Sequence, residues 1–115
     1  MEKQHTLKRA ISYAGVGLHS GREVHMTLRP APVDTGILFR RSDRAGQPAV
    51  QASAANVTST VRATTIEERG TKFFTIEHLM SAFAAAGIDN CVVELDEEEP
   101  PVGDGSALEI GRAHV

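Results

Sequence analysis

The sequence predicts an α+β domain, a two-layer sandwich in which helices cover one face of a mainly antiparallel sheet. Apolar and polar residues alternate over residues 24–29, which is the pattern of a half-buried strand. A helix is indicated further on, where apolar residues recur at i, i+3, i+4 and i+7. These residues are Ile76, Leu79, Met80 and Phe83. Several strand patterns precede this helix and one follows it, an order typical of α+β domains.

The first strands are separated by glycine and proline. A strand is expected over residues 6–13, and a glycine-rich loop over residues 14–21. The alternating strand at residues 24–29 ends at Pro30, because proline cannot continue a sheet ladder. A third strand is expected over residues 36–40, after a turn.

The middle of the chain is less regular. Residues 41–59 are rich in Ala, Ser, Gln and Asp, and they form either a long loop or a small insertion with short strands. Residues 62–67 and 71–74 then predict a hairpin.

The predicted helix begins at Thr75, whose hydroxyl can cap it, and ends at Gly87. A strand follows over residues 91–95. The acidic residues 96–99 precede two prolines, and such a charge run is typical of a solvated loop. Residues 104–106 have the composition of a turn followed by a helix cap.

Composition narrows the class of protein. At 115 residues, with 41% hydrophobic and 23% charged residues, the chain is expected to form one soluble domain. The net charge of -3 argues against a nucleic-acid partner. There is no stretch long enough for an integral membrane segment and no signal peptide pattern, so a cytoplasmic location is expected. The single cysteine, Cys91, lies in an apolar run and is expected to be a reduced core thiol.

Glu77 and His78 are the residues best suited to chemistry. They are adjacent in the first turn of the predicted helix and lie outside its apolar stripe. A zinc hydrolase needs three protein ligands and a carboxylate that accepts a proton, so the pair could supply one ligand and one base. An ordinary surface Glu and His would give the same pattern. The other histidines form no H-x-x-x-H pattern, so the chain lacks enough ligands for a free-standing zinc enzyme.

His19 lies in the glycine-rich loop, which either shapes a site or simply turns a corner. The glycine spacing does not match a dinucleotide-binding fingerprint. Thr64 and Thr65, expected in mid-strand, are read either as ordinary strand residues or as polar groups of a site.

Six motifs, taken in order and spacing, resemble the first domain of the zinc-dependent UDP-3-O-acyl-N-acetylglucosamine deacetylases. The similarity runs from about residue 3 to residue 108. The motifs are TLKR at 6–9, GVGLHSG at 15–21, LRPAP at 28–32, TIEHL at 75–79, GIDN at 87–90 and PVGDGSA at 101–107.

The resemblance implies a hydrolase of lipid A biosynthesis in Gram-negative bacteria, which removes the N-acetyl group from UDP-3-O-(3-hydroxyacyl)-N-acetylglucosamine. It implies that Glu77 is the general base and that His78 is a ligand of the zinc cofactor. It also places four substrate-binding residues near the site: Leu18, His19, Val61 and Thr64.

The same resemblance implies that residues 1–115 are one domain, the N-terminal half of a two-domain deacetylase whose second domain is absent from this sequence. The remaining zinc ligands of the family lie in that second domain, in an H-K-x-x-D helix. The chain alone is therefore expected to be inactive, and the face that the second domain would cover could mediate self-association. The alternative function is a non-catalytic binding or assembly module of the same fold.

Overall fold

The computed structural model describes residues 3–101 and 112–114. Its elements along the chain are β1 (His5–Leu7), β2 (Ile11–Val16), β3 (Glu23–Pro30), β4 (Ile37–Arg41), β5 (Ala49–Gln51), η1 (Ala54–Asn56), β6 (Val57–Ser59), β7 (Thr65–Glu68), β8 (Thr71–Phe74), α1 (Glu77–Ala86), β9 (Cys91–Leu95) and β10 (Arg112–His114). The helix cap predicted at residues 104–106 lies outside the described residues.

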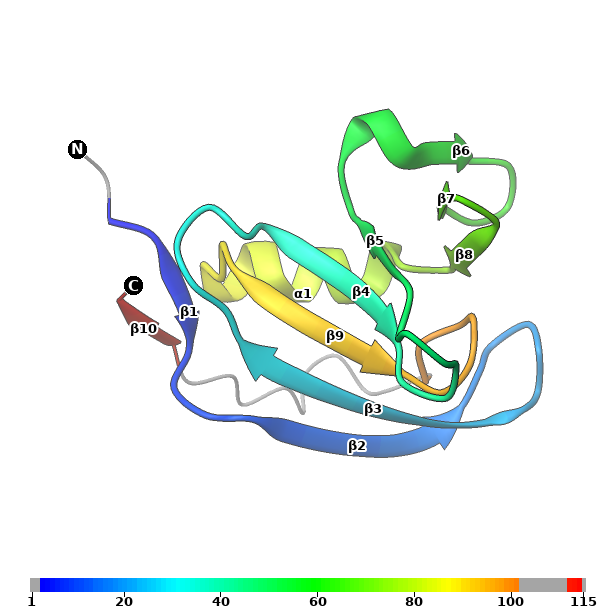
Figure 1. Cartoon of the computed structure of the whole chain (residues 1–115), viewed down its shortest axis with the longest axis horizontal. Helices are drawn as coiled ribbons and strands as arrows, with labels where there is room; N and C mark the ends of the chain where they lie inside the picture. Colours follow the sequence, from blue (N-terminus) through cyan, green and yellow to red (C-terminus); the bar gives the residue numbers. More distant parts are fainter. Residues whose placement is uncertain (1–2, 102–111, 115) are drawn as a thin grey trace.

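The main sheet has five strands in the order β2-β3-β9-β4-β5. The pairs β2–β3, β3–β9 and β4–β5 are antiparallel, and β4–β9 is parallel. The helix α1 covers one face of this sheet, which gives two layers (Figure 1). The predicted α+β class with a mainly antiparallel sheet is therefore confirmed.

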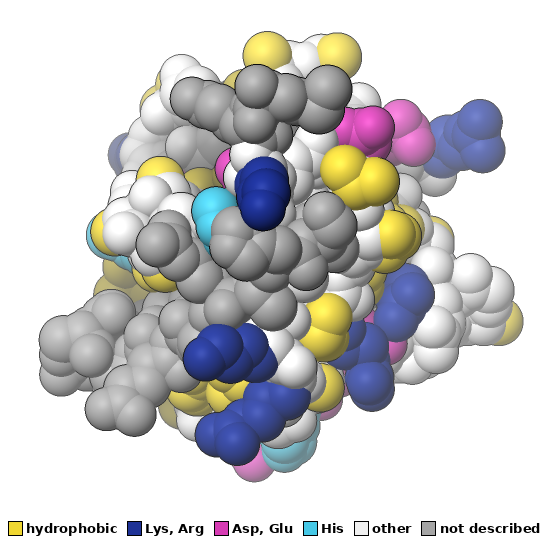
Figure 2. Space-filling view, turned by 90° about the vertical axis from the view of Figure 1, so that its left-hand side faces the viewer, with side chains coloured by type: hydrophobic (Ala, Val, Ile, Leu, Met, Phe, Trp, Pro, Cys, Tyr) yellow, Lys and Arg dark blue, Asp and Glu magenta, His cyan; other side chains and the backbone are white. Residues whose placement is uncertain are grey.

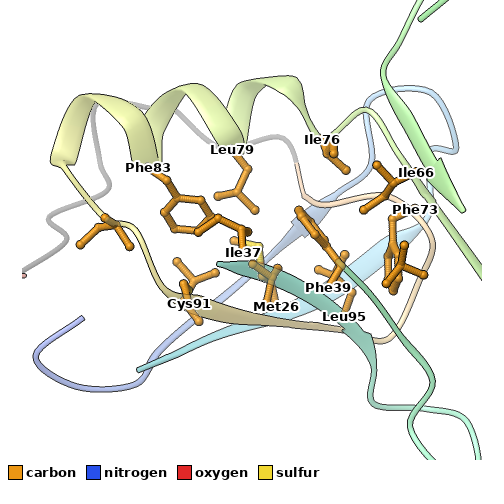
Figure 3. Close-up of a cluster of buried hydrophobic side chains, with 14 of the residues drawn as sticks. Met26, Ile37, Phe39, Ile66, Phe73, Ile76, Leu79, Phe83, Cys91 and Leu95 are labelled. Carbon is orange, nitrogen blue, oxygen red and sulfur yellow. The ribbon is translucent and has the colours of Figure 1, made fainter. Parts of the chain in front are cut away.

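The core lies between the sheet and α1. The helix contributes Leu79 and Phe83, and Ile76 precedes it, all less than 10% exposed. They point toward the sheet residues Phe39 and Cys91 (Figure 3). The predicted helix stripe is confirmed, with Met80 at its edge and only partly buried. Burial of this apolar face stabilises a ten-residue helix that would be marginal in isolation.

The first predicted strand is two strands. Residues 8–10 break it, so that β1 pairs with β10 while β2 joins the main sheet. The loop predicted from residue 14 was wrong at its start, because Gly15 lies inside β2 and pairs with Val24.

Residues 41–59 are a small insertion with short strands, one of the two readings that the sequence left open. Strand β6 joins the hairpin β7–β8 in a three-stranded sheet at one end of the molecule (Figure 1). The hairpin was predicted, but its first strand starts at Thr65. Arg62 has a left-handed backbone with φ of 66°, which is incompatible with an extended strand.

The C-terminal end of α1 was predicted correctly, and the N-terminal cap was not. Gly87 ends the helix in a left-handed conformation with φ of 72°, as expected. The cap predicted at Thr75 was wrong: Thr75 has φ of 58°, and the residue before the helix is Ile76, which makes no side-chain capping bond. The Thr75 hydroxyl oxygen lies near His19 Nδ1 instead.

Within the described residues, no helix is long and apolar enough to cross a membrane. On the end of the molecule that Figure 2 shows, Lys and Arg side chains stand in separate small groups among apolar and uncharged ones.

Cys91 is a core thiol, as predicted. It is fully buried, and burial raises its pKa to about 12. Because the thiolate is the reactive form, we expect Cys91 in the folded chain to react with Ellman's reagent at least about 100-fold more slowly than in the chain unfolded by guanidinium chloride. Equal rates in the two states would contradict this burial.

Candidate functional site

Four segments meet at the right-hand end of the molecule in Figure 1. They are the loop after β2, the segment after β9, the start of α1 and the stretch before β7. Backbone and side-chain hydrogen bonds, given below, join these segments. All six residues predicted for the site belong to them: Leu18, His19, Val61, Thr64, Glu77 and His78.

Glu77 is the first residue of α1 and is partly buried. The backbone N–H of Thr64 donates a hydrogen bond to Glu77 Oε1 over 2.9 Å. The N–H of Ile76 faces the carbonyl oxygen of Thr64 at 3.5 Å. Thr64 therefore contributes to the site through its backbone, and it orients the carboxylate.

His78 follows Glu77 and is exposed. Successive helical side chains are rotated by about 100°, so the two groups project from neighbouring faces of the first turn. Among the described residues, no group of three or more His, Cys, Asp and Glu side chains could hold a metal ion. The pair therefore offers one imidazole and one carboxylate side by side, which is too few groups to form a metal site within the described residues.

A second network surrounds Glu99, whose side chain is 1% exposed. Its Oε1 accepts hydrogen bonds from the backbone N–H groups of His19, at 3.1 Å, and Ser20, at 3.0 Å. Its Oε2 lies 2.9 Å from His19 Nδ1. Thr75 Oγ1 lies 3.0 Å from the same nitrogen, which links this network to the start of α1.

The prediction of a solvated loop at residues 96–99 was wrong for Glu99. Burial raises the pKa of this carboxyl group, but hydrogen bonds from the Ser20 N–H, the Thr75 hydroxyl and His19 outweigh burial and bring the pKa to about 2. The carboxylate is therefore ionised at neutral pH although it is buried.

The rest of the acidic segment is also attached to its surroundings. Asp96 accepts hydrogen bonds from the backbone N–H of His25, at 2.7 Å, and lies 2.8 Å from its Nδ1. Glu97 pairs with Arg22 over 3.7 Å. The segment from 96 to 99 therefore contacts both the loop that carries His19 and strand β3, which follows that loop.

Gly17 leaves room for Glu99. A Cβ atom at Gly17 would stand 2.3 Å from Glu99 Oε1 and 2.4 Å from Ser20 Oγ, closer than real atoms approach. This is the glycine of the loop whose missing side chain matters for the site.

Leu18 and Val61 expose apolar side chains, 57% and 78% respectively. Leu18 precedes His19, which contacts Glu99, and Val61 lies in the same stretch as Thr64, which contacts Glu77.

Sequence reasoning missed Glu99, Thr75 and Gly17 as parts of the site. Glu99 stands in an acidic run before two prolines, which resembles solvated sequence. Its role comes from donors about 80 residues earlier, and no local pattern records that contact.

The fold and these networks define an α+β domain that brings an adjacent Glu-His pair, and a contact between a buried Glu and a half-exposed His, to one end of its sheet. The sequence model of the UDP-3-O-acyl N-acetylglycosamine deacetylase family matches residues 4–113. The chain belongs to this family.

Relatives named UDP-3-O-acyl-N-acetylglucosamine deacetylase agree with the family match. Those of Marinobacter nauticus, Hahella chejuensis and Pseudomonas entomophila are each 53% identical to the chain over 107 residues. The matches cover 93% of the chain and 35% of each relative. The chain thus spans about a third of the length of the curated relatives it matches.

Proposed function

We propose that this chain is the first domain of a zinc-dependent deacetylase that removes the N-acetyl group from UDP-3-O-(3-hydroxyacyl)-N-acetylglucosamine. The observation that carries the proposal is the Glu77 carboxylate at the start of α1, oriented by the Thr64 N–H and adjacent to the exposed His78. The reaction belongs to lipid A biosynthesis in Gram-negative bacteria. The family membership and the names of the relatives support this substrate.

Glu77 is the proposed general base. A carboxylate with one oxygen held by a backbone N–H can direct its other oxygen at a water molecule. It would take a proton from the water that attacks the acetyl carbonyl, and could return that proton to the leaving amine. The Thr64 hydrogen bond keeps the side chain in one orientation, which lowers the entropic cost of the proton transfer.

His78 is the proposed zinc ligand of this domain. Its exposure leaves the imidazole accessible to a metal, and the other ligands would come from a second domain. Zinc, when bound, supplies Lewis-acid polarisation of the acetyl carbonyl. Residues 1–115 would supply the N-terminal domain in this arrangement.

The remaining predicted site residues are proposed to contact the substrate. Leu18 and Val61 offer exposed apolar surface to the acyl chain. His19 and Thr64 lie at the polar side of the site, through the networks around Glu99 and Glu77.

A hybrid enzyme tests the proposal. In this hybrid, the chain replaces the matching segment of the Marinobacter nauticus relative, and deacetylation of UDP-3-O-acyl-N-acetylglucosamine is measured. Turnover within about tenfold of the unmodified relative is expected, because binding and transition-state contacts would be kept. A folded hybrid without turnover would favour the alternative, a non-catalytic binding or assembly module.

The 115-residue chain alone is expected to bind zinc weakly and to give no measurable deacetylation, because one imidazole cannot replace three ligands. Calorimetric titration with zinc and an assay of acetate release check both parts. Normal turnover by the isolated chain would contradict the proposed division of ligands.

Two further properties complete the proposal. The protein is proposed to act in the cytoplasm, and the buried free thiol of Cys91 supports that location. The outer side of α1 exposes Ser81, Ala84 and Ala85 beyond His78, and their short side chains suit close packing against a second domain or a second copy. Light scattering of the chain at high concentration checks for self-association, and a clean monomer would count against it.

A further inference from the structure

The contact between Glu99 and His19 determines which ring nitrogen carries a proton. An ionised carboxylate only accepts hydrogen bonds, so the nitrogen that faces it must donate. Glu99 Oε2 lies 2.9 Å from His19 Nδ1. Nδ1 therefore carries the hydrogen.

A neutral imidazole has one N–H group, so the second nitrogen, Nε2, then holds a lone pair. The His19 side chain is 47% exposed, whereas that of Glu99 is 1% exposed. The ring is thus anchored on its buried side, and its accepting nitrogen is on the side away from the carboxylate.

Two local features show that this contact is built into the fold. Gly17 has no side chain where a Cβ would stand 2.3 Å from Glu99 Oε1. Thr75, a β-branched residue, has a left-handed backbone with φ of 58° and a buried side chain whose oxygen lies 3.0 Å from His19 Nδ1. Such a conformation is strained for a β-branched residue and persists only where the surroundings impose it.

Thr75 also places the contact between His19 and Glu99 near the start of α1. Thr75 stands two residues before Glu77, at the start of α1. The loop that carries His19 is therefore tied to the turn of the helix that carries the proposed base and zinc ligand.

We propose that Glu99 is a positioning residue that holds His19 in the Nδ1–H tautomer beside the start of α1, so that Nε2 presents a hydrogen-bond acceptor to a hydroxyl or amide N–H of the substrate. The identity of the substrate rests on the proposed function. The tautomer of His19 and its dependence on Glu99 can be measured in this chain without any substrate.

Glu99→Gln is the direct test. Gln has the same shape, but only one end of its amide accepts hydrogen bonds. Its oxygen is expected to face the two backbone N–H groups at Oε1, which leaves its NH₂ group against Nδ1. The NH₂ group donates, so His19 must switch to the Nε2–H tautomer.

The tautomer is read from the ¹⁵N shifts of the imidazole in the 115-residue chain, by two-dimensional NMR at a pH above the end of the ring's own measured titration. We expect Nδ1–H in the native chain and Nε2–H in Glu99→Gln. Glu98→Gln, which removes a charge from the neighbouring residue, should keep Nδ1–H. An Nε2–H tautomer in the native chain would overturn the inference even if Glu99→Gln does not fold, and so would an unchanged tautomer in a folded Glu99→Gln.

A double-mutant cycle in the hybrid enzyme tests whether the effect reaches catalysis. Glu99→Gln is expected to lower kcat/KM about tenfold when His19 is present, and to have no further effect in a His19→Ala background. Equal losses in both backgrounds would mean that Glu99 does not act through His19. If the hybrid is inactive, the proposed function fails, and the NMR result still decides the positioning of His19.

Discussion

Replacing Glu77 by Gln is expected to lower kcat of the hybrid enzyme by at least about 100-fold, with little change in KM. General-base catalysis by a positioned carboxylate contributes about 10²- to 10⁴-fold, and an amide cannot accept the proton. The fold should be kept, because the Gln oxygen can still accept the Thr64 N–H that now bonds to Glu77 Oε1. Steady-state kinetics, with circular dichroism to check the fold, measure this effect.

Glu67→Gln is the matched control. Glu67 is an exposed residue of β7 and has no part in the networks of the site. Its substitution should leave kcat within about twofold of the hybrid. A Glu77→Gln hybrid that kept most of its activity would show that another group takes the proton.

Acid is expected to destabilise the chain through Glu99. The folded state lowers the pKa of this group from 4.5 to about 2. A lowered pKa contributes stability above the unfolded value, and this contribution is lost as the pH falls from about 4.5 to about 2. A shift of this size corresponds to about 3 kcal/mol of unfolding free energy, a large share for a domain of this size.

Urea unfolding at a series of pH values, for the native chain and for Glu99→Gln, isolates this contribution. The native chain should be more stable than the variant at neutral pH, and the difference should shrink between about pH 4.5 and pH 2. Glu98→Gln should follow the native profile. A difference between native chain and Glu99→Gln that did not change with pH would contradict the assigned pKa.

Local periodicity was enough to predict the helix side of the core, the strand β3 and the α+β class. The helix stripe of Ile76, Leu79 and Phe83 follows from spacing alone, because burial selects apolar residues on one face. The strand at β3 and the helix end at Gly87 also rest on local signals.

The errors have a common physical cause. Thr75 was predicted to cap the helix because threonine often does, but the contact with His19, 56 residues away, holds it in a left-handed conformation. Glu99 looked solvated because three of its neighbours are acidic, yet donors in a distant loop bury it. Contacts between segments far apart in the chain override local preference at both positions.

The candidate site was predictable only in part. The motif around Glu77 and His78 could be found from sequence because the two residues are adjacent. The orientation of Glu77 by the Thr64 N–H could not, because a backbone donor has no signature in the residue type. The structure shows these positions, and the role of each residue in catalysis stays a prediction.

Zinc binding by the hybrid enzyme, compared between native His78 and His78→Ala, tests most directly whether this chain supplies a ligand to a deacetylase site. His25→Ala, which removes an exposed histidine of β3, is the control. We expect zinc affinity to fall at least about 100-fold in His78→Ala, because one of three protein ligands is lost. We expect it to be unchanged in His25→Ala, because His25 is not a proposed ligand. Native zinc affinity in a folded His78→Ala hybrid would contradict the proposed role of this domain.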